Sequence, residues 1–293
     1  MLRASVEVVI PARNEEKRLP GTCRALVSQN LLPSRIILLH DGEVDHNSTC
    51  SSCKIVRALP HSELFEVVHV DHPSWRQRGT PEMAELFNIG FSHVSSSADY
   101  VMILGADHVI SRNYIKQIVS NMKRDDVRLA SGIIGSSKAA IPRGSGRIVH
   151  VDTWKRVMGQ LRYPLSYGFE TYPVLKFQMC GYKTAVYGVP SHLTRMTGGS
   201  TNYVNYGRGM KFLGYTKKYA LTRALITAIR FRNPSKGIQM IVGYLTYQIT
   251  SDVAKWLAAT QDELISKYFR SPKGVPFLGI LLGYIRGATG SGY

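Results

Sequence analysis

YVMILGADHVI, residues 100–110, is a run of apolar residues that ends abruptly in Gly105, Ala106, Asp107 and His108. A buried strand has this pattern when it delivers polar side chains to the edge of a sheet. The two small residues allow a ligand to approach the backbone, and the carboxylate and imidazole that follow are both candidate metal ligands. Acidic residues also follow strands in simple turns, so this stretch alone leaves a purely structural interpretation open.

Strand, helix and strand alternate at the start of the chain. Val6–Ile10 is expected to form a buried strand that Pro11 ends, and Arg35–Leu39 a second strand. The residues between them have a helical pattern up to about Gln29. A βαβ unit of this spacing gives a parallel sheet, which binds ligands at the carboxyl ends of its strands.

Acidic residues follow both of these strands. Glu15 comes after the first strand and Asp41 after the second, so both are expected at the same edge of the sheet as Asp107. Each has a structural alternative. Glu15 would be an acid in the first turn of a helix, favoured by the helix dipole, and Asp41 a turn residue before a glycine.

The rest of the first 200 residues continues the alternation. We expect strands at Glu66–Val70, Arg128–Ile134 and Lys183–Tyr187, and helices at Pro81–Val94, Tyr114–Met122 and Val151–Leu161. Gly144–Arg147 is expected to be a glycine-broken basic loop. Glu170 precedes a further helical segment that ends at Gly181.

The composition is that of a folded chain with an unusual charge. There are 37 Lys and Arg against 20 Asp and Glu, which gives a net charge of +17. This balance favours an anionic partner, such as nucleic acid, anionic lipid or a phosphorylated substrate. The first residues run straight into a strand, so no secretory signal is expected. No window of about 18 apolar residues predicts a membrane span.

Most of the net charge comes from one block of the sequence. Between Glu170 and Asp252 there is no acidic residue. The block contains eleven basic residues, namely Lys176, Lys183, Arg195, Arg208, Lys211, Lys217, Lys218, Arg223, Arg230, Arg232 and Lys236. Because solvated basic faces normally interleave acids, their absence favours a phosphate-rich partner.

Aromatic and apolar residues recur in the same block at helical spacing, among them Phe212, Tyr215, Tyr219 and Ile226. Basic side chains beside amphipathic aromatics suit a helix that lies in a membrane interface, and a helix packed on the rest of the protein would show the same pattern. After a break at Asn233, the sequence from Ser235 to Phe269 is expected to be mainly helical.

Cys50 and Cys53 form a CxxC motif, with His46 just before it. A zinc site would need further ligands, and Cys23 and Cys180 lie far away in the sequence. We therefore expect free thiols or a local disulfide rather than zinc.

Four motifs, in this order, resemble the family 2 glycosyltransferases over roughly residues 4–200. VVIPARNEE resembles that family's opening strand and donor-binding turn. IILLHDG resembles the strand that ends in paired aspartates and glycine, with His40 at the first aspartate. ILGADH falls on the metal-binding aspartate motif, with Gly105 in place of the first aspartate and Asp107 as the second. GFETYPVLKFQMCGYK is similar to the segment of the catalytic base, and Glu170 falls on the base position.

The resemblance implies an α/β fold of the GT-A type, with a Rossmann-like mixed, mainly parallel sheet flanked by helices. Residues 1–200 would form the catalytic domain, with the nucleotide sugar in its first half and the acceptor in its second. Residues 201–293 would form a helical, basic extension that binds a membrane or the acceptor. YGRGMKFLGY and the basic, aromatic helices after it are similar to archaeal and bacterial members that act on lipid-linked acceptors, including polyprenyl-phosphate mannosyltransferases.

The resemblance also implies transfer of a sugar, with inversion, from a nucleoside diphosphate donor. Asp107 would be the first ligand of a Mn²⁺ or Mg²⁺ ion that stabilises the departing diphosphate. Because Gly105 removes a carboxylate, His108 and His192 are candidates for further ligands, although such histidines are more often structural. Ligation by an imidazole would favour Mn²⁺.

Glu170 would be the catalytic base that deprotonates an acceptor hydroxyl, or would only orient an acceptor phosphate that is already ionised. Its structural alternative is an acid at a helix N-terminus. The implied donor-binding residues are Pro11, Arg13, Glu15, Asp41, Ala106 and Asp107. Arg195, Arg208 and Lys211 are candidates for binding the diphosphate or a lipid phosphate.

We therefore predict a metal-dependent glycosyltransferase with GDP-mannose as the favoured donor and UDP-sugars next. The predicted acceptor is a polyprenyl or dolichyl phosphate, or a lipid-linked glycan. The predicted location is the cytoplasmic face of the cell membrane, with the C-terminal helices lying on an anionic surface or shallowly in it. One alternative is a nucleotidyltransferase on a similar sheet, although PARNEE lacks that class's glycine-rich loop. Another is a non-enzymatic basic protein that binds membrane or nucleic acid, with nucleic acid the less favoured partner.

Overall fold

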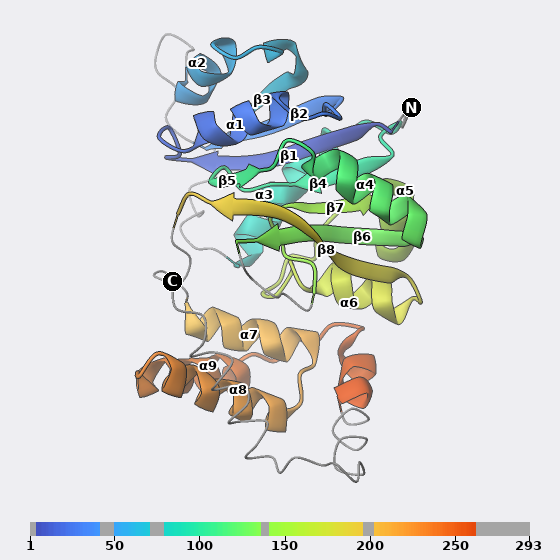
Figure 1. Ribbon diagram of the computed structural model, residues 1–293. Helices are drawn as coiled ribbons and strands as arrows, with labels where there is room; N and C mark the ends of the chain where they lie inside the picture. The colour runs from blue at the N-terminus through green and yellow to red at the C-terminus, as the bar shows by residue number, and fades with distance from the viewer. Residues whose placement is uncertain (1–3, 42–49, 71–78, 136–140, 196–201, 262–293) are drawn as a thin grey trace. The chain divides into compact units, whose positions relative to one another are not determined.

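Two compact units make up this protein. The computed structural model describes residues 4–41, 50–70, 79–135, 141–195 and 202–261 (Figure 1). The first unit comprises residues 1–76, 81–165 and 173–200, and the second comprises residues 77–80, 166–172 and 201–293. The chain therefore leaves the first unit at residues 166–172 and then returns to it. The assignment of catalytic and membrane-binding roles to parts of the chain stays a prediction.

The first unit is built on an eight-stranded sheet with the order β3-β2-β1-β4-β7-β6-β8-β5. The strands are β1 (Val6–Arg13), β2 (Arg35–Asp41), β3 (Phe65–His69), β4 (Tyr100–Ile103), β5 (His108–Ile110), β6 (Val127–Ile134), β7 (Arg147–His150) and β8 (Lys183–Leu193). The pairs β1–β2, β1–β4, β2–β3 and β6–β8 are parallel, and the pairs β4–β7, β6–β7 and β5–β8 are antiparallel. The predicted mixed, mainly parallel sheet is confirmed.

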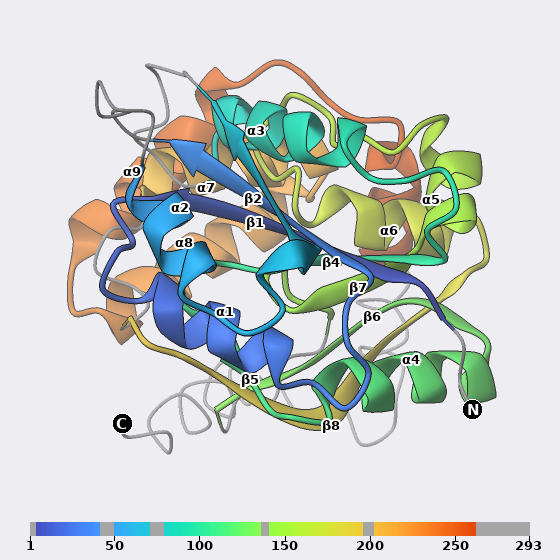
Figure 2. The ribbon, with the colours of Figure 1, turned by 90° about the horizontal axis from the view of Figure 1, so that it is seen from above.

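Helices cover both faces of this sheet. They are α1 (Leu19–Val27), α2 (Ser51–Arg57), α3 (Pro81–Ser92), α4 (Tyr114–Asp125), α5 (Val151–Met158) and α6 (Tyr172–Met179), and a 3-10 turn (Ser62–Leu64) precedes β3. Figure 2 shows α1 and α4 on one face, and α3 and α5 on the other. Successive residues of β1 serve both layers: Val8 and Ile10 join the core formed with α1 and α4, and Val9 lies against Gly90 of α3. Strands covered on both faces read as continuous apolar runs, which explains the pattern of the sequence.

Several elements differ from the sequence predictions. β1 continues through Pro11 to Arg13, because its pairing with β4 ends at Val9 and the missing N–H of proline removes no bond on that side. Arg147, predicted to end a loop, begins β7. The short elements α2, with 7 residues, and β5, with 3 residues, were not predicted. The segment Ser235–Phe269, predicted to be mainly helical, is helical at residues 235–246 and 254–261, with a break at residues 247–253 that was not predicted. Its end lies outside the described residues.

The second unit is helical where it is described beyond residue 201. It contains α7 (Tyr203–Leu213), α8 (Lys217–Arg230) and α9 (Pro234–Thr246), followed by the helical residues 254–261. The backbones of α7 and α9 touch at two glycines: a Cβ on Gly207 would lie 2.0 Å from the carbonyl oxygen of Met240, and one on Gly243 2.0 Å from that of Val204. In the parts of the chain that the structure describes, no helix has both the length and the apolar character that crossing a bilayer requires.

Candidate active site

Three charged side chains of the first unit meet beyond the carboxyl ends of β1, β4 and β8. Arg195 pairs with the carboxylate of Glu15, and its Nε lies 3.6 Å from Oδ2 of Asp107. The side chains of Glu15 and Asp107 are each only 11% exposed, whereas that of Arg195 is 35% exposed. We call Glu15, Asp107 and Arg195 the carboxyl-edge cluster. It combines two shielded carboxylates with a cation that solvent can reach.

The turn after β1 positions Glu15. Asn14 adopts a left-handed backbone conformation with φ of 51°, a region that asparagine tolerates better than most residues. The carbonyl of Glu15 then accepts the N–H groups of Arg18 and Leu19, where α1 begins. Its carboxylate also lies 3.4 Å from Nη1 of Arg18. Glu15 is therefore an ion-pair partner of two arginines as well as an acid next to a helix start.

Ser145 holds the loop that presents Asp107. Its Oγ accepts the N–H of Gly105 at 2.8 Å and lies 2.6 Å from Nδ1 of His108. A Cβ on Gly105 would lie 3.0 Å from Oδ1 of Asp107 and 3.3 Å from Oγ of Ser145. A side chain at position 105 would therefore crowd this network. Position 105 of this loop therefore suits a glycine, whereas the motif that it resembles has an aspartate there.

His108 and His192 point to opposite faces of the sheet. In the β5–β8 pair, His108 lies opposite Leu193 and Val109 opposite His192, and successive residues of a strand alternate between faces. His108 is fully buried. Burial lowers its pKa to about 4, His192 adds to this effect and Asp107 opposes it, so the ring is neutral at pH 7. Because the two rings point in opposite directions, the β5–β8 pairing does not support the prediction that both bind the same metal ion. Their role as ligands stays a prediction.

The described residues hold one group of three His, Cys, Asp or Glu side chains whose ligand atoms all lie within 4.8 Å of one another. That group consists of residues other than Asp107, His108 and His192. A divalent ion held by Asp107 would therefore need oxygens from the substrate or from water among its further ligands.

The other predicted donor-binding residues belong to the same edge. Pro11 and Arg13 lie in the last part of β1, and Asp41, the last residue of β2, is the cross-strand neighbour of Arg13. Ala106 is buried, and its carbonyl accepts a hydrogen bond from Oγ1 of Thr22 in α1 at 2.8 Å. The predicted donor residues thus lie at one edge of the sheet, where the parallel strands have their carboxyl ends.

Glu170 belongs to the second unit. It is exposed and lies in the turn at residues 167–171, just before α6. Gly168 in this turn has φ of +77°, and a Cβ on it would lie 3.1 Å from Cα of Gly209 in α7. Phe169, next to Glu170, is fully buried. The turn is therefore held by close backbone packing on α7.

Two of the three predicted phosphate-binding residues lie on α7. Nη1 of Arg208 donates to Oη of Tyr167 at 2.8 Å, and its guanidinium lies 5.0 Å from the centre of that ring. Nζ of Lys211 lies 5.5 Å from the centre of the Tyr244 ring. Arg208 is thus tied to the turn that carries Glu170, whereas Arg195 belongs to the first unit.

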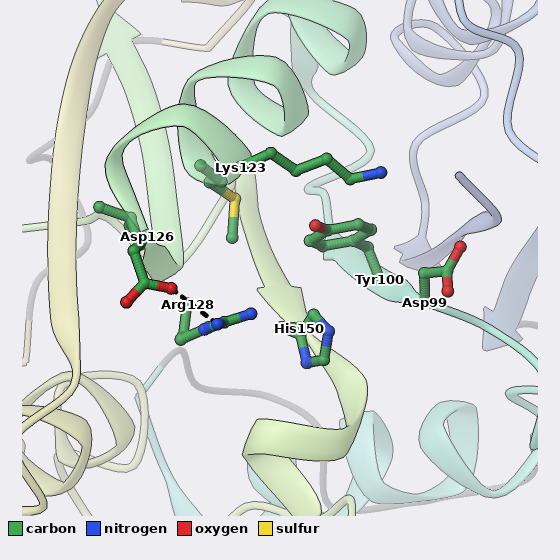
Figure 3. A pocket seen from close by; sticks show the side chains of 8 residues that line it. Asp99, Tyr100, Lys123, Asp126, Arg128 and His150 are labelled. Carbon is green, nitrogen blue, oxygen red and sulfur yellow. Dashed lines mark hydrogen bonds and ion pairs between the residues drawn. The ribbon is translucent and has the colours of Figure 1, made fainter. Parts of the chain in front are cut away.

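A cavity of about 310 Å³ lies at the opposite edge of the sheet, where β4 and β6 begin and β7 ends. Tyr100, Arg128 and His150 line it, and Arg128 pairs with Asp126 at 2.6 Å (Figure 3). Ligands of open α/β sheets bind at the carboxyl ends of the strands. We therefore place the candidate active site at the carboxyl-edge cluster and not in this cavity.

Ser145 is the residue of this site that the sequence analysis missed. It lies in the Gly144–Arg147 segment, which was interpreted only as a basic loop. The available signal was a hydroxyl residue between two glycines, Gly144 and Gly146, a pattern that allows the loop to fold against a neighbouring turn.

Comparisons with known proteins identify the family and the fold of this chain. The family described as Glycosyl transferase family 2 matches residues 7–181. Mannosyltransferase PcManGT from Pyrobaculum calidifontis, solved with GDP-Man and Mn²⁺, has a TM-score of 0.55 at 16% identity, and the alignment covers 99% of this chain and 81% of that one. S. aureus TarS 1-349 with UDP-GlcNAc has a TM-score of 0.52 at 13% identity, with 82% and 71% covered. No curated protein sequence matches the chain. At these identities the two structures share its fold.

Proposed function

This chain belongs to glycosyl transferase family 2, whose members use nucleotide-sugar donors, and we propose that it transfers mannose from GDP-mannose to a lipid-linked acceptor at a membrane surface. The observation that carries the proposal is the carboxyl-edge cluster. It gathers Glu15, Asp107 and Arg195 from three separate segments at the edge where α/β sheets bind nucleotides.

In this proposal, Arg195 and a metal ion at Asp107 bind the diphosphate of the donor. The reaction leaves negative charge on the departing diphosphate, and a preorganised cation stabilises such charge. Arg195 has a partly exposed guanidinium, which can donate two parallel hydrogen bonds to phosphate oxygens. Pro11, Arg13, Glu15, Asp41 and Ala106 would hold the base and ribose.

The donor atoms at this edge fit one Mg²⁺ or Mn²⁺ ion. Such ions in nucleotide enzymes commonly bind one or two carboxylates, and phosphate oxygens and waters supply the other ligands. Asp107 offers one carboxylate, and oxygens of the diphosphate and of water would complete the coordination. Bound there, the ion would act as a Lewis acid on the diphosphate. The GDP-Man and Mn²⁺ in the Pyrobaculum mannosyltransferase support this choice of donor and metal.

Glu170 would serve the acceptor. As an exposed carboxylate on a turn fixed against α7, it is suited to take the proton from an acceptor hydroxyl. Arg208 would bind an acceptor phosphate, since its guanidinium is already oriented by Tyr167 of the same turn. Candidate acceptors are a polyprenyl or dolichyl phosphate and a lipid-linked glycan.

Exposed apolar side chains of the second unit support the proposed membrane contact. Leu221, Leu225 and Ile229 recur at every fourth residue of α8 and are 59%, 51% and 44% exposed. The same helix carries exposed Lys217, Lys218 and Arg230. A row of apolar side chains with basic residues around it suits a helix that lies in the interface of an anionic membrane. We propose the cytoplasmic face of the cell membrane as its location.

Thermal unfolding with a panel of nucleotide sugars tests the donor assignment. A ligand that binds only the folded state raises the melting temperature, by an amount equivalent to about 2.7 kcal/mol at a hundred times its Kd. We expect the largest increase for GDP-mannose with Mn²⁺, and a much smaller one in Asp107→Asn and Arg195→Gln. Arg156→Gln, on an exposed arginine of α5, is the matched control. A larger increase for a UDP-sugar would reassign the nucleotide, and no increase for any donor would contradict the proposal.

A further inference from the structure

Four potential metal ligands of the first unit gather at the carboxyl ends of β2 and β3. His40 and His69 are cross-strand neighbours, with ring centres 5.6 Å apart. Cys50 and Cys53 come from the start of α2. The ligand atoms of His40, Cys50 and His69 all lie within 4.8 Å of one another. Sγ of Cys53 lies 3.8 Å from Nε2 of His69 and 2.9 Å from Sγ of Cys50.

We propose that His40, Cys50, Cys53 and His69 bind one Zn²⁺ ion. Two thiolates and two imidazoles are a ligand set that selects zinc over Mg²⁺, Mn²⁺ or Ca²⁺. Around a tetrahedral zinc ion with bonds of about 2.0–2.3 Å, neighbouring ligand atoms lie roughly 3.4–3.8 Å apart. The Cys53–His69 distance already matches. The two sulfurs are 2.9 Å apart, closer than this range, so the half-buried side chain of Cys53 would have to rotate when the ion binds.

The surroundings of His40 orient its ring for this role. Its Nδ1 lies 2.8 Å from Oγ of Ser52, and this contact is buried. Histidine ligands commonly use one ring nitrogen for the metal and hydrogen-bond through the other, which fixes the tautomer and the direction of the ring. Ser52 would therefore be a positioning residue that leaves Nε2 of His40 as the ligand atom.

Cys50 is positioned by the helix that it begins. Its Sγ accepts the N–H of Cys53 at 3.1 Å as the N-cap of α2, so the two sulfurs face the same side of the first turn. Cys50 and His40 are 1% and 4% exposed, whereas His69 is exposed. An ion would enter past His69 and Cys53.

Zinc here would be structural. Four protein ligands leave no open position for a catalytic water. The ion would join β2, the edge strand β3 and α2, and it would sit next to Asp41, a predicted donor-binding residue. Free thiols or a disulfide were expected from the sequence because a zinc site needs further ligands and Cys23 and Cys180 lie far away in the sequence. The nearby histidine, His46, lies outside the described residues. Only the pairing of β2 with β3 brings His40 and His69 together.

Metal analysis of the full-length protein tests the site directly. After expression with added Zn²⁺ and gel filtration, we expect about one zinc per chain, and X-ray absorption at the zinc edge should show two sulfur and two nitrogen ligands at about 2.3 and 2.0 Å. Less than about a tenth of a zinc per chain, or a shell without sulfur, would overturn the proposal. So would a Cys50–Cys53 disulfide, found by mass spectrometry in the same preparation.

Two matched pairs of variants separate the site from the other cysteines and histidines of the chain. Cys53→Ser and His69→Gln change the two outer ligands, so the fold should survive, and each should weaken zinc binding at least tenfold and lower the melting temperature. Cys180→Ser and His61→Gln make the same chemical changes at other exposed positions of the first unit and should retain wild-type zinc content. Equal zinc content in all four variants would refute the assignment. If a variant does not fold, the zinc content and the X-ray absorption spectrum of the wild-type protein decide the question.

Discussion

Arg195 neutralises two carboxylates, Glu15 and Asp107, that would otherwise repel each other in a shielded position. The guanidinium lies within ion-pair distance of both side chains and offsets part of this repulsion when no ligand is bound. A phosphate or a divalent cation arriving at this edge would exchange these ion pairs for new ones. The site can therefore bind a charged substrate by exchanging ion pairs, and this exchange depends on the side chain of Arg195.

Glu170→Gln distinguishes between the two kinds of acceptor. A positioned general base contributes about 10²–10⁴-fold to a rate, because it removes the proton of a hydroxyl in the transition state. With a lipid-linked glycan as acceptor, we expect the variant to transfer sugar at least about 100-fold more slowly. With a polyprenyl phosphate, which is already ionised, we expect a loss of less than about tenfold.

Initial rates with each acceptor, together with the Kd of the donor, measure this effect. Donor affinity should stay within about twofold of wild type, because Glu170 is assigned to the acceptor. Asp152→Asn, at an exposed acid in the first turn of α5, is the control for loss of one negative charge. Wild-type rates of Glu170→Gln with both acceptors would contradict the proposed role.

His150 should make stability depend on pH. It caps α5 by accepting the N–H of Thr153 on Nδ1 at 3.3 Å, and burial, assisted by the charge of Arg128, lowers its pKa. The unfolded chain takes up this proton near pH 6.5, before the folded protein does. The free energy of unfolding should therefore fall as the pH decreases from about 7 through 6.5 and below.

Urea unfolding of wild type and His150→Asn at a series of pH values isolates this contribution. Asparagine is a good N-cap residue that does not titrate in this range, so the variant should lose stability less steeply on acidification. An unchanged slope in the variant would show that His150 is not the cause.

At the level of single residues, Glu15, Asp107 and Arg195 could be proposed from the sequence because they follow strands or lie in an acid-free block, and their roles stay predictions. It did not find Ser145 or the set formed by His40 and His69. Those residues act through partners that are distant in the sequence, and a contact across strands depends on register, which no local pattern reports.

Among the elements, α4 is linked to two segments of the sheet by the hydroxyl of Tyr114, in addition to its apolar packing on the core. Oη of Tyr114 donates to the carbonyl of Gly146 at 2.8 Å and accepts the N–H of Gly132 at 2.7 Å. Tyr114→Phe would leave both backbone groups buried without this partner, which costs about 1–3 kcal/mol of stability. Denaturant unfolding measures the loss. Tyr187→Phe, which removes a bond to Asp125 nearer the surface, should lose well under 1 kcal/mol, and an equal loss in both would argue against this role.

α8 should carry the membrane affinity of the second unit. Replacing Leu221 and Leu225 by glutamate removes apolar area from the row and reverses the local charge, so binding to vesicles that contain an anionic phospholipid should weaken at least about tenfold. Vesicle sedimentation measures this. Leu32→Glu changes an exposed leucine of the first unit and should have no effect. Undiminished vesicle binding of the double variant would exclude α8 as the contact.

The long helices and strands could be predicted from the periodicity of their apolar residues. The elements that were missed or wrongly bounded have physical explanations. β1 passes through Pro11 because one side of the strand has no partner there, a fact that depends on where β4 ends. α2 and β5 are too short to show a period, and tertiary pairing determines them. β7 begins directly after the glycine-containing turn that the sequence analysis interpreted as a loop.

For the whole molecule, composition anticipated a basic helical part after the sheet. It did not anticipate that residues 166–172, which carry Glu170, belong to the same compact unit as residues 201–293. That association depends on the close packing of Gly168 on Gly209. As a result, the residue proposed for the acceptor and the helix proposed for the membrane belong to one unit, and the proposed donor residues belong to the other.

Transfer of radiolabelled mannose from GDP-mannose to polyprenyl phosphate in anionic vesicles, with Mn²⁺ present, tests the central assignment most directly. We predict that the wild-type protein forms a labelled lipid, and that Asp107→Asn reduces the rate at least about 100-fold while Arg156→Gln retains it. A rate for Asp107→Asn equal to that of wild type, or no labelled product from GDP-mannose or any UDP-sugar with either class of lipid-linked acceptor, would contradict the account.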